Sequence, residues 1–198
     1  MQTEQNTKKK ILSYNSPVIL TYAIISLVVL ILGYITKGWT TKTFFTVYDG
    51  SLLNPLFYLR LFTHAIGHAN LAHYVGNFTY ILLLGPMLEE KYGSKRLLTM
   101  MIFTAGITGV LNVILFNTGL LGASGIVFML IILSSCSSMK EKKGIPITLI
   151  VVAILFIGNE LISAFSPDNI SQFGHILGGL CGGCFGYFFG KKKELKPY

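Results

Sequence analysis

The sequence is poor in charge, and above all in acidic residues. Only 12% of its 198 residues are charged, and 8 Asp and Glu stand against 16 Lys and Arg. The only aspartates are Asp49 and Asp168, both expected in loops, which excludes an aspartyl protease because that mechanism needs two carboxylates that share a proton. A helical zinc protease is excluded as well, since no His-Glu-x-x-His pattern occurs.

Cysteine is also scarce. The three cysteines, Cys136, Cys181 and Cys184, all fall in apolar stretches. Cys181 and Cys184 have the spacing of a metal site, but a structural zinc site needs a second pair of ligands, and disulfide frameworks belong to small secreted domains. We therefore interpret all three as small, apolar, packed side chains.

Long apolar runs, in contrast, are plentiful. Hydrophobic residues make up 52% of the chain, and six stretches approach the roughly 20 residues that a helix needs to cross a bilayer. The first is too long for a signal peptide and lacks a small-residue cleavage pattern, so it counts as a membrane span. We predict an all-α membrane protein, a six-transmembrane-helix bundle over residues 17–190 between tails at 1–16 and 191–198. The six spans are expected at 17–35, 68–88, 95–115, 121–138, 145–165 and 171–190.

The positions of the basic residues predict the orientation of this bundle. Thirteen Lys and Arg fall at the two termini and after the second and fourth stretches, whereas only Lys37, Lys42 and Arg60 lie in the alternate connections. Cytoplasmic loops carry the excess of Lys and Arg in membrane proteins. Both termini are therefore expected in the cytoplasm, and the net charge of +8 reflects topology rather than a nucleic-acid partner.

The connection over residues 38–67 is the longest, and it is rich in aromatic residues. A loop of that length without obvious periodicity is uncommon unless it is functional. Its apolar content predicts that it is partly embedded at the outer membrane interface, where Tyr and Phe are favoured.

Glycines recur every four residues in the last apolar stretch, at Gly178, Gly182, Gly186 and Gly190. They fall near one helical face, and small residues on such a face let a neighbouring helix approach closely. We expect Gly178 and Gly182 to serve helix packing.

A few polar side chains lie at or inside the predicted spans, where ionisable residues are costly enough to suggest a function. A serine–lysine dyad is excluded because every lysine lies in a loop or a tail. Serine with histidine remains, since a neutral imidazole can take the proton of an attacking hydroxyl and return it to the leaving amine. The polar set consists of His64, His68, His73, Asn77, Ser124 and His175.

Ser124 is expected in the first turn of the fourth span. Free backbone N–H groups and the positive end of the helix dipole favour a developing oxyanion there. Gly122 and Gly125 let a substrate backbone come close. The Asn77 amide and a histidine N–H can donate further hydrogen bonds to the same oxygen.

Three motifs occur in the order and on the spans typical of one known family. They are GASG at 122–125, HYVGN at 73–77 and HILGGLCG at 175–182, and the segments RLFTHAIGHANLAH at 60–73 and EEKYGS at 89–94 are similar as well. Over residues 17–190 the chain thereby resembles the rhomboid family of intramembrane serine proteases.

The resemblance implies a role for each candidate residue. Ser124 is the nucleophile and His175 is the general base and acid, with no third acid expected. The oxyanion is held by the side chains of His73 and Asn77 and by the Ser124 backbone N–H. No cofactor and no metal are implied. We expect the substrate cavity, with a polar and wet mouth, to be formed by His64, His68, Gly122, Ala123 and Gly125.

Two regions add to or depart from the family pattern. Arg60 falls where the family has a Trp-Arg pair in its first outer loop, but this chain has Leu59 before the arginine. The span at 145–165 and the loop after it resemble the family's proposed substrate gate and cap. Glu160 in that span is interpreted as a near-surface residue that reaches the interface.

We expect an intramembrane serine endopeptidase of the plasma membrane that hydrolyses peptide bonds in or near the transmembrane segments of membrane-protein substrates. Its active site should open toward the extracytoplasmic side, and its partners are those substrates and the lipid bilayer. One alternative is a catalytically silent rhomboid-like protein that binds transmembrane helices, because fold does not guarantee function.

Two further alternatives stay open. His64, His68 and His73 invite a metal site, since imidazoles four residues apart can share an ion. A small transporter or metal channel would predict inverted repeats and discontinuous helices, and the sequence has no internal symmetry.

Overall fold

The computed structural model of the chain describes residues 15–116, 118–140 and 171–189, together with positions 147, 150, 151, 154, 155 and 158. The stretch predicted at 145–165 therefore lies largely outside the described residues, and so do Glu160 and almost all of both predicted tails. Within the described residues the chain is helical, and the β contact consists of one isolated antiparallel bridge between Val47 and Leu120.

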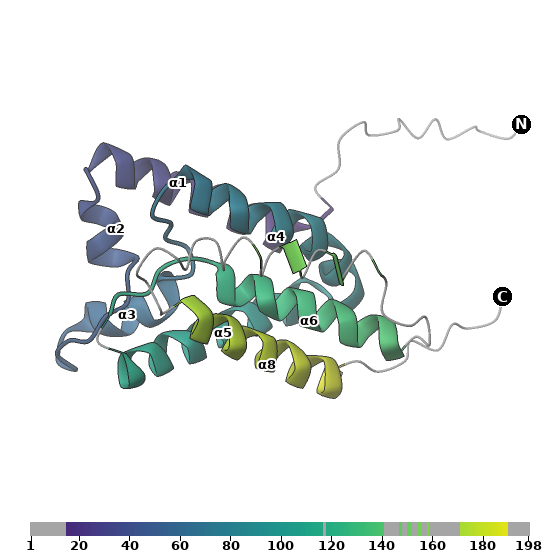
Figure 1. The fold of residues 1–198 in the computed structure, drawn as a ribbon. Coiled ribbons are helices and arrows are strands. Elements are labelled where there is room, and N and C mark those ends of the chain that lie inside the picture. The colour runs from purple at the N-terminus through teal and green to yellow at the C-terminus, as the bar shows by residue number, and fades with distance from the viewer. Residues whose placement is uncertain are drawn as a thin grey trace, which may run out of the picture.

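The helices follow one another along the chain in the order that Figure 1 labels. They are α1 (Pro17–Ile35), α2 (Trp39–Phe44), α3 (Pro55–Thr63), α4 (Leu71–Tyr92), α5 (Ser94–Leu115), α6 (Ser124–Lys140) and α8 (Ser171–Phe189). Among the described helices, α1, α4 and α5 are long and apolar enough to cross a membrane, and α6 has a shorter apolar stretch. The predicted all-α fold is thus confirmed for the described part. That the chain crosses the membrane six times, with both termini in the cytoplasm, stays a prediction.

The predicted helix limits hold well where capping signals are simple. α1 covers the predicted 17–35, with Pro17 in its first turn, where a missing N–H costs nothing. α4 starts at Leu71 rather than at 68, because the side chain of Asn70 accepts a hydrogen bond from the His73 N–H and so caps the helix. α4 ends at Tyr92, and the positive φ of 82° at the next residue, Gly93, lets the chain turn directly into α5.

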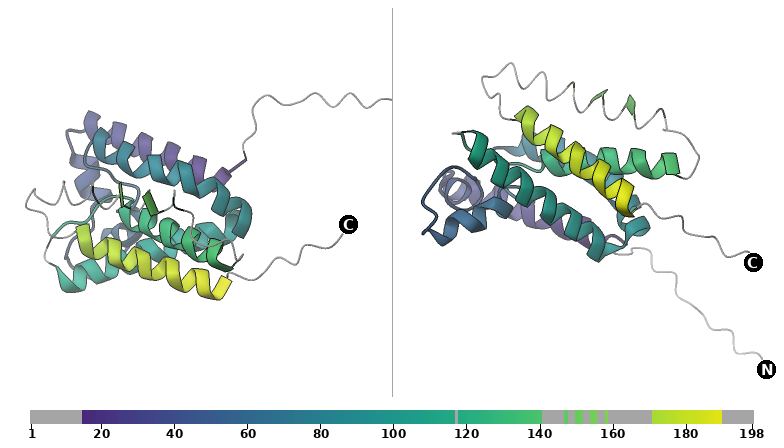
Figure 2. Two further views of the ribbon diagram at one scale, coloured as in Figure 1. Left: turned by 45° about the vertical axis from the view of Figure 1, so that its right-hand side comes forward. Right: turned by 90° about the horizontal axis from the view of Figure 1, so that it is seen from below.

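α6 is the central helix of the bundle. It contacts α4, α5 and α8, and its contact with α8 is the most extensive between any two described helices. In both Figure 1 and the left view of Figure 2, α1 and α4 lie along one side of α6 and α8 lies along the other. The apolar stretch of α6, Ser124–Cys136, suits this central position.

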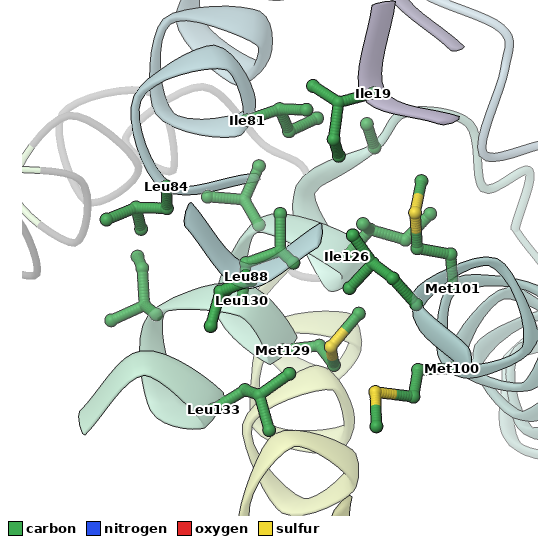
Figure 3. Close-up of a cluster of buried hydrophobic side chains, with 14 of the residues drawn as sticks. Ile19, Ile81, Leu84, Leu88, Met100, Met101, Ile126, Met129, Leu130 and Leu133 are labelled. Carbon is green, nitrogen blue, oxygen red and sulfur yellow. The ribbon is translucent and has the colours of Figure 1, made fainter. Parts of the chain in front are cut away.

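The buried core lies where α1, α4, α5 and α6 meet (Figure 3). Large aliphatic side chains from these helices interdigitate, and methionines of α5 fill the space beside α6. The labelled members are Ile19, Ile81, Leu84, Leu88, Met100, Met101, Ile126, Met129, Leu130 and Leu133.

The contact between α6 and α8 depends on glycine. A Cβ atom on Gly178 would collide with the backbone carbonyl of Gly125, and one on Gly182 would collide with the carbonyl of Met129. A Cβ atom on Gly186 would lie 2.5 Å from the Cβ of Cys136. The two helix backbones therefore approach more closely than any larger residue on this face would allow.

The long connection before α4 is more ordered than its sequence indicates, because it contains α2 and α3. Arg60 is buried; its Nε donates to the carbonyl of Thr43 at 2.8 Å, and its guanidinium lies 4.4 Å from the ring centroid of Tyr48. Thr63 donates to the carbonyl of Phe44. Arg60 therefore joins α3 to the end of α2 without the tryptophan that the family has at position 59.

Candidate active site

The turn before α6 positions Ser124 as the first residue of that helix. Gly122 has a φ of +123°, which disfavours any residue with a Cβ, and its N–H donates to the carbonyl of His64 at 2.9 Å. Ala123 is fully buried and Ser124 is half-buried. Ser124 thus belongs to the first helical turn, whose N–H groups have no acceptor within the helix.

His73 and Asn77 of α4 lie against this turn. A Cβ atom built on Gly122 would be 2.7 Å from Nε2 of His73 and 3.9 Å from Nδ2 of Asn77. Nδ2 of Asn77 donates to the His73 carbonyl at 3.2 Å, and the amide group has a second N–H to give. Because α4 contacts α6, two donors from one helical face meet the backbone that leads into Ser124.

His175 of α8 is buried beside the first turns of α6. Its ring stacks on Phe128, with centroids 4.6 Å apart and an interplanar angle of 13°. Phe128 follows Ser124 by four residues, so the two share one face of α6. The carbonyl of Gly174, the neighbour of His175, would lie 3.4 Å from a Cβ atom on Gly125. α8 therefore brings the imidazole to the face of α6 that carries the serine.

A small cavity lies next to Ser124. Its volume is about 10 Å³, close to the space that one water molecule needs. His64 lines it, together with Thr108 of α5 and Gly174 of α8. A single water at this place would lie beside the candidate nucleophile.

His64 has one defined tautomer at this cavity. Its Nε2 lies 3.0 Å from the carbonyl oxygen of Ala105, which can only accept, so Nε2 is the donor. Burial lowers the pKa of His64 to about 4, against the opposing effect of the bond to Ala105. The ring is neutral at physiological pH, and its buried Nδ1 has no hydrogen-bond partner in the described part of the chain.

His68 lies elsewhere than expected. It is buried, and it lines a separate pocket between α1 and α2 instead of the cavity beside Ser124. Its Nδ1 donates to the carbonyl of Ile66 at 3.1 Å, and its ring packs at 5.1 Å from the ring of His73. Burial, and then the charge of His73, lower the pKa of His68 to about 3. His68 therefore packs against His73 and does not line the cavity beside Ser124, where the sequence analysis had placed it, whereas His64 does line that cavity.

The rings of His68 and His73 pack against each other, but the described histidines do not form a metal site. Among the residues that the structure describes, no group of three or more His, Cys, Asp and Glu side chains could hold a metal ion. His64 and His68 each use one ring nitrogen on a backbone carbonyl, which directs them to different neighbours.

Sequence reasoning missed two residues of this site. Phe128 forms the surface on which His175 stacks, and its spacing of four residues from Ser124 was the available signal. Thr108 lines the cavity, and its hydroxyl donates back to the carbonyls of Thr104 and Ala105. Nothing in the sequence marks Thr108, because threonines in membrane helices commonly bond to their own helix.

Comparisons with a family model and with curated proteins all lead to rhomboid proteins. The family model described as the Rhomboid domain matches residues 56–192. The chain is 31% identical to the rhomboid protease GluP of Bacillus subtilis (strain 168), over 93% of this chain and 37% of that protein. It is 27% identical to the rhomboid-like protein 15 of Arabidopsis thaliana, over 92% of this chain and 47% of that protein. The chain thus spans less than half the length of these curated relatives.

Proposed function

The chain belongs to the rhomboid family, and from this we propose that it is an intramembrane serine endopeptidase that cleaves peptide bonds in or near transmembrane segments of membrane proteins. The observation that carries the proposal is the meeting of three helices at one turn. Ser124 begins α6, His73 and Asn77 of α4 lie against Gly122, and His175 of α8 stacks on the serine-bearing face of α6.

The proposed reaction uses Ser124 and His175 as a dyad. The Ser124 hydroxyl attacks the scissile carbonyl carbon while His175 takes its proton, which gives a tetrahedral intermediate. His175 then returns the proton to the leaving amine as the C–N bond breaks and an acyl-enzyme remains. A water attacks this ester through the same steps and releases the carboxylic acid and the serine hydroxyl.

The negative oxygen of each intermediate needs hydrogen-bond donors. Asn77 and His73 are candidates from α4, and the Ser124 backbone N–H is the candidate from α6. These groups are held in place before reaction by their own helices, and such preorganised donors stabilise a developing charge strongly.

A substrate must enter by moving part of the protein. The cavity beside Ser124 has room for about one water molecule, so an extended peptide does not fit without displacement of neighbouring segments. A helix also hides its carbonyls in hydrogen bonds and must unwind locally. We propose the stretch at 145–165 as the gate, and we expect small or helix-breaking residues near the cleaved bond.

The membrane orientation is part of the proposal. Ser124 starts α6 at the end of the bundle where α1 stops and α4 starts, and the turn at Lys91, Lys95 and Arg96 lies at the other end. Basic residues mark the cytoplasmic side. A six-span topology with cytoplasmic termini, in the plasma membrane, then opens the active site toward the extracytoplasmic side.

A serine-directed fluorophosphonate tests the nucleophile directly. The full chain in detergent should be labelled, the Ser124→Ala variant should not, and the matched Ser134→Ala variant in the same helix should be labelled like the parent chain. His175→Ala should abolish both labelling and cleavage of a membrane-embedded reporter while the fold persists. A chain that folds, binds transmembrane helices and is never labelled would instead be the silent, helix-binding protein.

A further inference from the structure

A large pocket opens at the end of the bundle away from Ser124. Its volume is about 810 Å³, and it lies between the start of α5 and the C-terminal half of α8. The right view of Figure 2 shows these two helices side by side, with the end of α8 next to the start of α5. None of the candidate active-site residues lines it.

One wall of the pocket is apolar and faces the surroundings of the bundle. Phe103 of α5 and Phe185 of α8 lie with ring centroids 5.8 Å apart, and Met100 packs beside them. Phe103 is 53% exposed, and it belongs to a helix long and apolar enough to cross a membrane. An alkyl chain is the natural neighbour of such a wall.

The end of the pocket at the α4–α5 turn is cationic. Lys95 and Arg96 in the first turn of α5 both line it and are exposed. The Arg96 guanidinium lies 5.3 Å from the ring centroid of Phe189, which holds it at the rim of the pocket. Its N–H groups point outward in the guanidinium plane and can still donate to a ligand. In the described part of the chain neither cation has a carboxylate partner.

Tyr92 contributes an unsatisfied hydroxyl. The residue lines the pocket and is 6% exposed, and its buried hydroxyl has no hydrogen-bond partner within the described residues. Buried hydroxyls are nearly always paired, because an unmade hydrogen bond costs free energy. An acceptor oxygen at this end of the pocket would satisfy it.

Glu89 and Glu90, the acidic residues of α4 that precede the pocket in the chain, leave the site open to an anion within the described residues. The carboxylate of Glu89 accepts hydrogen bonds from the Val18 and Ile19 N–H groups and from the Ser94 hydroxyl, so it is directed to the start of α1. Glu90 is exposed on α4 and does not line the pocket.

We propose that this pocket binds one anionic phospholipid. The phosphate lies between Lys95 and Arg96 and accepts from the Tyr92 hydroxyl, and an acyl chain runs along Phe103 and Phe185. Two cations that have no acidic partner among the described residues favour a headgroup of net negative charge over a zwitterionic one, whose ammonium they repel. Basic pockets between membrane helices bind such lipids in the anionic leaflet. The proposal does not depend on proteolysis.

The test is lipid retention by the full chain in a neutral detergent, followed by native mass spectrometry. Dioleoylphosphatidylglycerol and dioleoylphosphatidylcholine are added in equal amounts. The parent chain should keep the phosphatidylglycerol preferentially. Replacing both cations, Lys95→Gln with Arg96→Gln, should weaken that binding about 30-fold, from the usual contribution of a basic residue near an anionic lipid.

Three further arms define the site. Tyr92→Phe should weaken retention about tenfold by removing one hydrogen bond to a charged group. Lys91→Gln is the matched control, an exposed lysine at the same end that does not line the pocket, and should change nothing. Raising the salt from about 0.1 M to about 1 M shortens the Debye length from about 10 Å to about 3 Å and should weaken binding in the parent chain.

Several outcomes would overturn the proposal. The first is unchanged retention of phosphatidylglycerol by the double variant. The second is a loss of retention in Lys91→Gln as large as the loss in the double variant, and the third is equal retention of both lipids by the parent chain. Displacement of the lipid by inorganic phosphate at equal concentration would identify a phosphate site and reject the lipid. If the double variant does not fold, Tyr92→Phe and the salt series decide alone, and the proposal fails if neither of them weakens retention.

Discussion

The contact between α6 and α8 and the contact between α1 and α4 hold the bundle together in different ways. Gly178 and Gly182 bring α8 against the backbone of α6, with no large side chain between them. α1 is joined to α4 by side chains that reach across, among them the Glu89 carboxylate, which accepts from two N–H groups at the start of α1. Close backbone approach fixes the distance between two helices narrowly, and long side chains allow more adjustment. The candidate dyad spans the first kind of contact.

The largest combined effect, on stability as well as on rate, is expected from Gly178→Val. Its side chain would meet the carbonyl of Gly125, so α8 must move away from α6 and carry His175 with it. Overpacking of this kind costs about 1–3 kcal/mol or more in stability, and a shift of about 1 Å at a catalytic group costs about 10²-fold in rate. Cleavage of a membrane reporter and thermal unfolding in detergent measure the two effects.

Gly183→Ala is the matched control for that change. A Cβ atom there would meet only the Cγ2 of Ile132, at an ordinary 3.9 Å. It should leave both cleavage and stability near those of the parent chain. Full cleavage by Gly178→Val would show that the glycine contact does not set the geometry of the dyad.

Asn77→Ala should come next. Loss of one oxyanion donor costs about 2.7–4 kcal/mol of transition-state stabilisation, which is about 10²–10³-fold in kcat. The residue is buried, but within the described residues its amide bonds to its own helix, so the α1–α4 contact should persist and the fold with it. Turnover and circular dichroism on the same preparation separate the effects. A kcat equal to that of the parent chain would remove Asn77 from the proposed oxyanion site.

Glu89→Gln probes the other contact. Glutamine has the same shape, but it is uncharged and only one of its two terminal atoms can accept, whereas both oxygens of Glu89 accept hydrogen bonds. The free energy of unfolding should therefore fall by about 1–3 kcal/mol. Cleavage by the folded fraction should be unchanged, because the residue lies far along α4 from Asn77. Glu90→Gln, on the exposed neighbour, should leave the unfolding temperature as it is. Equal shifts in both variants would contradict a specific role for Glu89.

The smallest effect is expected for Tyr74→Phe. This change removes the hydrogen bond from the Tyr74 hydroxyl to the Ala23 carbonyl at 3.0 Å, a second link between α4 and α1. One such bond contributes about 0.5–1.5 kcal/mol. Thermal unfolding compared with Tyr58→Phe, an exposed tyrosine of α3, measures it. A stability gain in Tyr74→Phe would show that the link is strained rather than stabilising.

The helices were predicted best where hydropathy and capping agree. α1 runs as predicted because an apolar run follows Pro17 directly. The start of α4 was misplaced because the Asn70 cap was not weighed against the hydropathy of the stretch. α3 was missed although Asn54 and Pro55 are a recognisable helix start, since the long connection was judged by its length and composition.

The sequence indicated candidate members of the site but not how their side chains are arranged. The family assignment from ordered motifs is confirmed by the match over residues 56–192, while the roles of Ser124, His175, His73 and Asn77 stay predictions. Placing His68 with His64 followed from their closeness in the chain. The segment between α3 and α4 turns them to different neighbours, which no local pattern records.

By itself the sequence determined the membrane-type helices, the family and the set of polar residues, because hydropathy, helical spacing and motif order are local properties of the chain. Only the tertiary structure decided that Gly178 touches Gly125, that His73 lies against Gly122 and that His175 stacks on Phe128. Those contacts join residues from different helices, and their distances result from packing of the whole bundle rather than from any one segment.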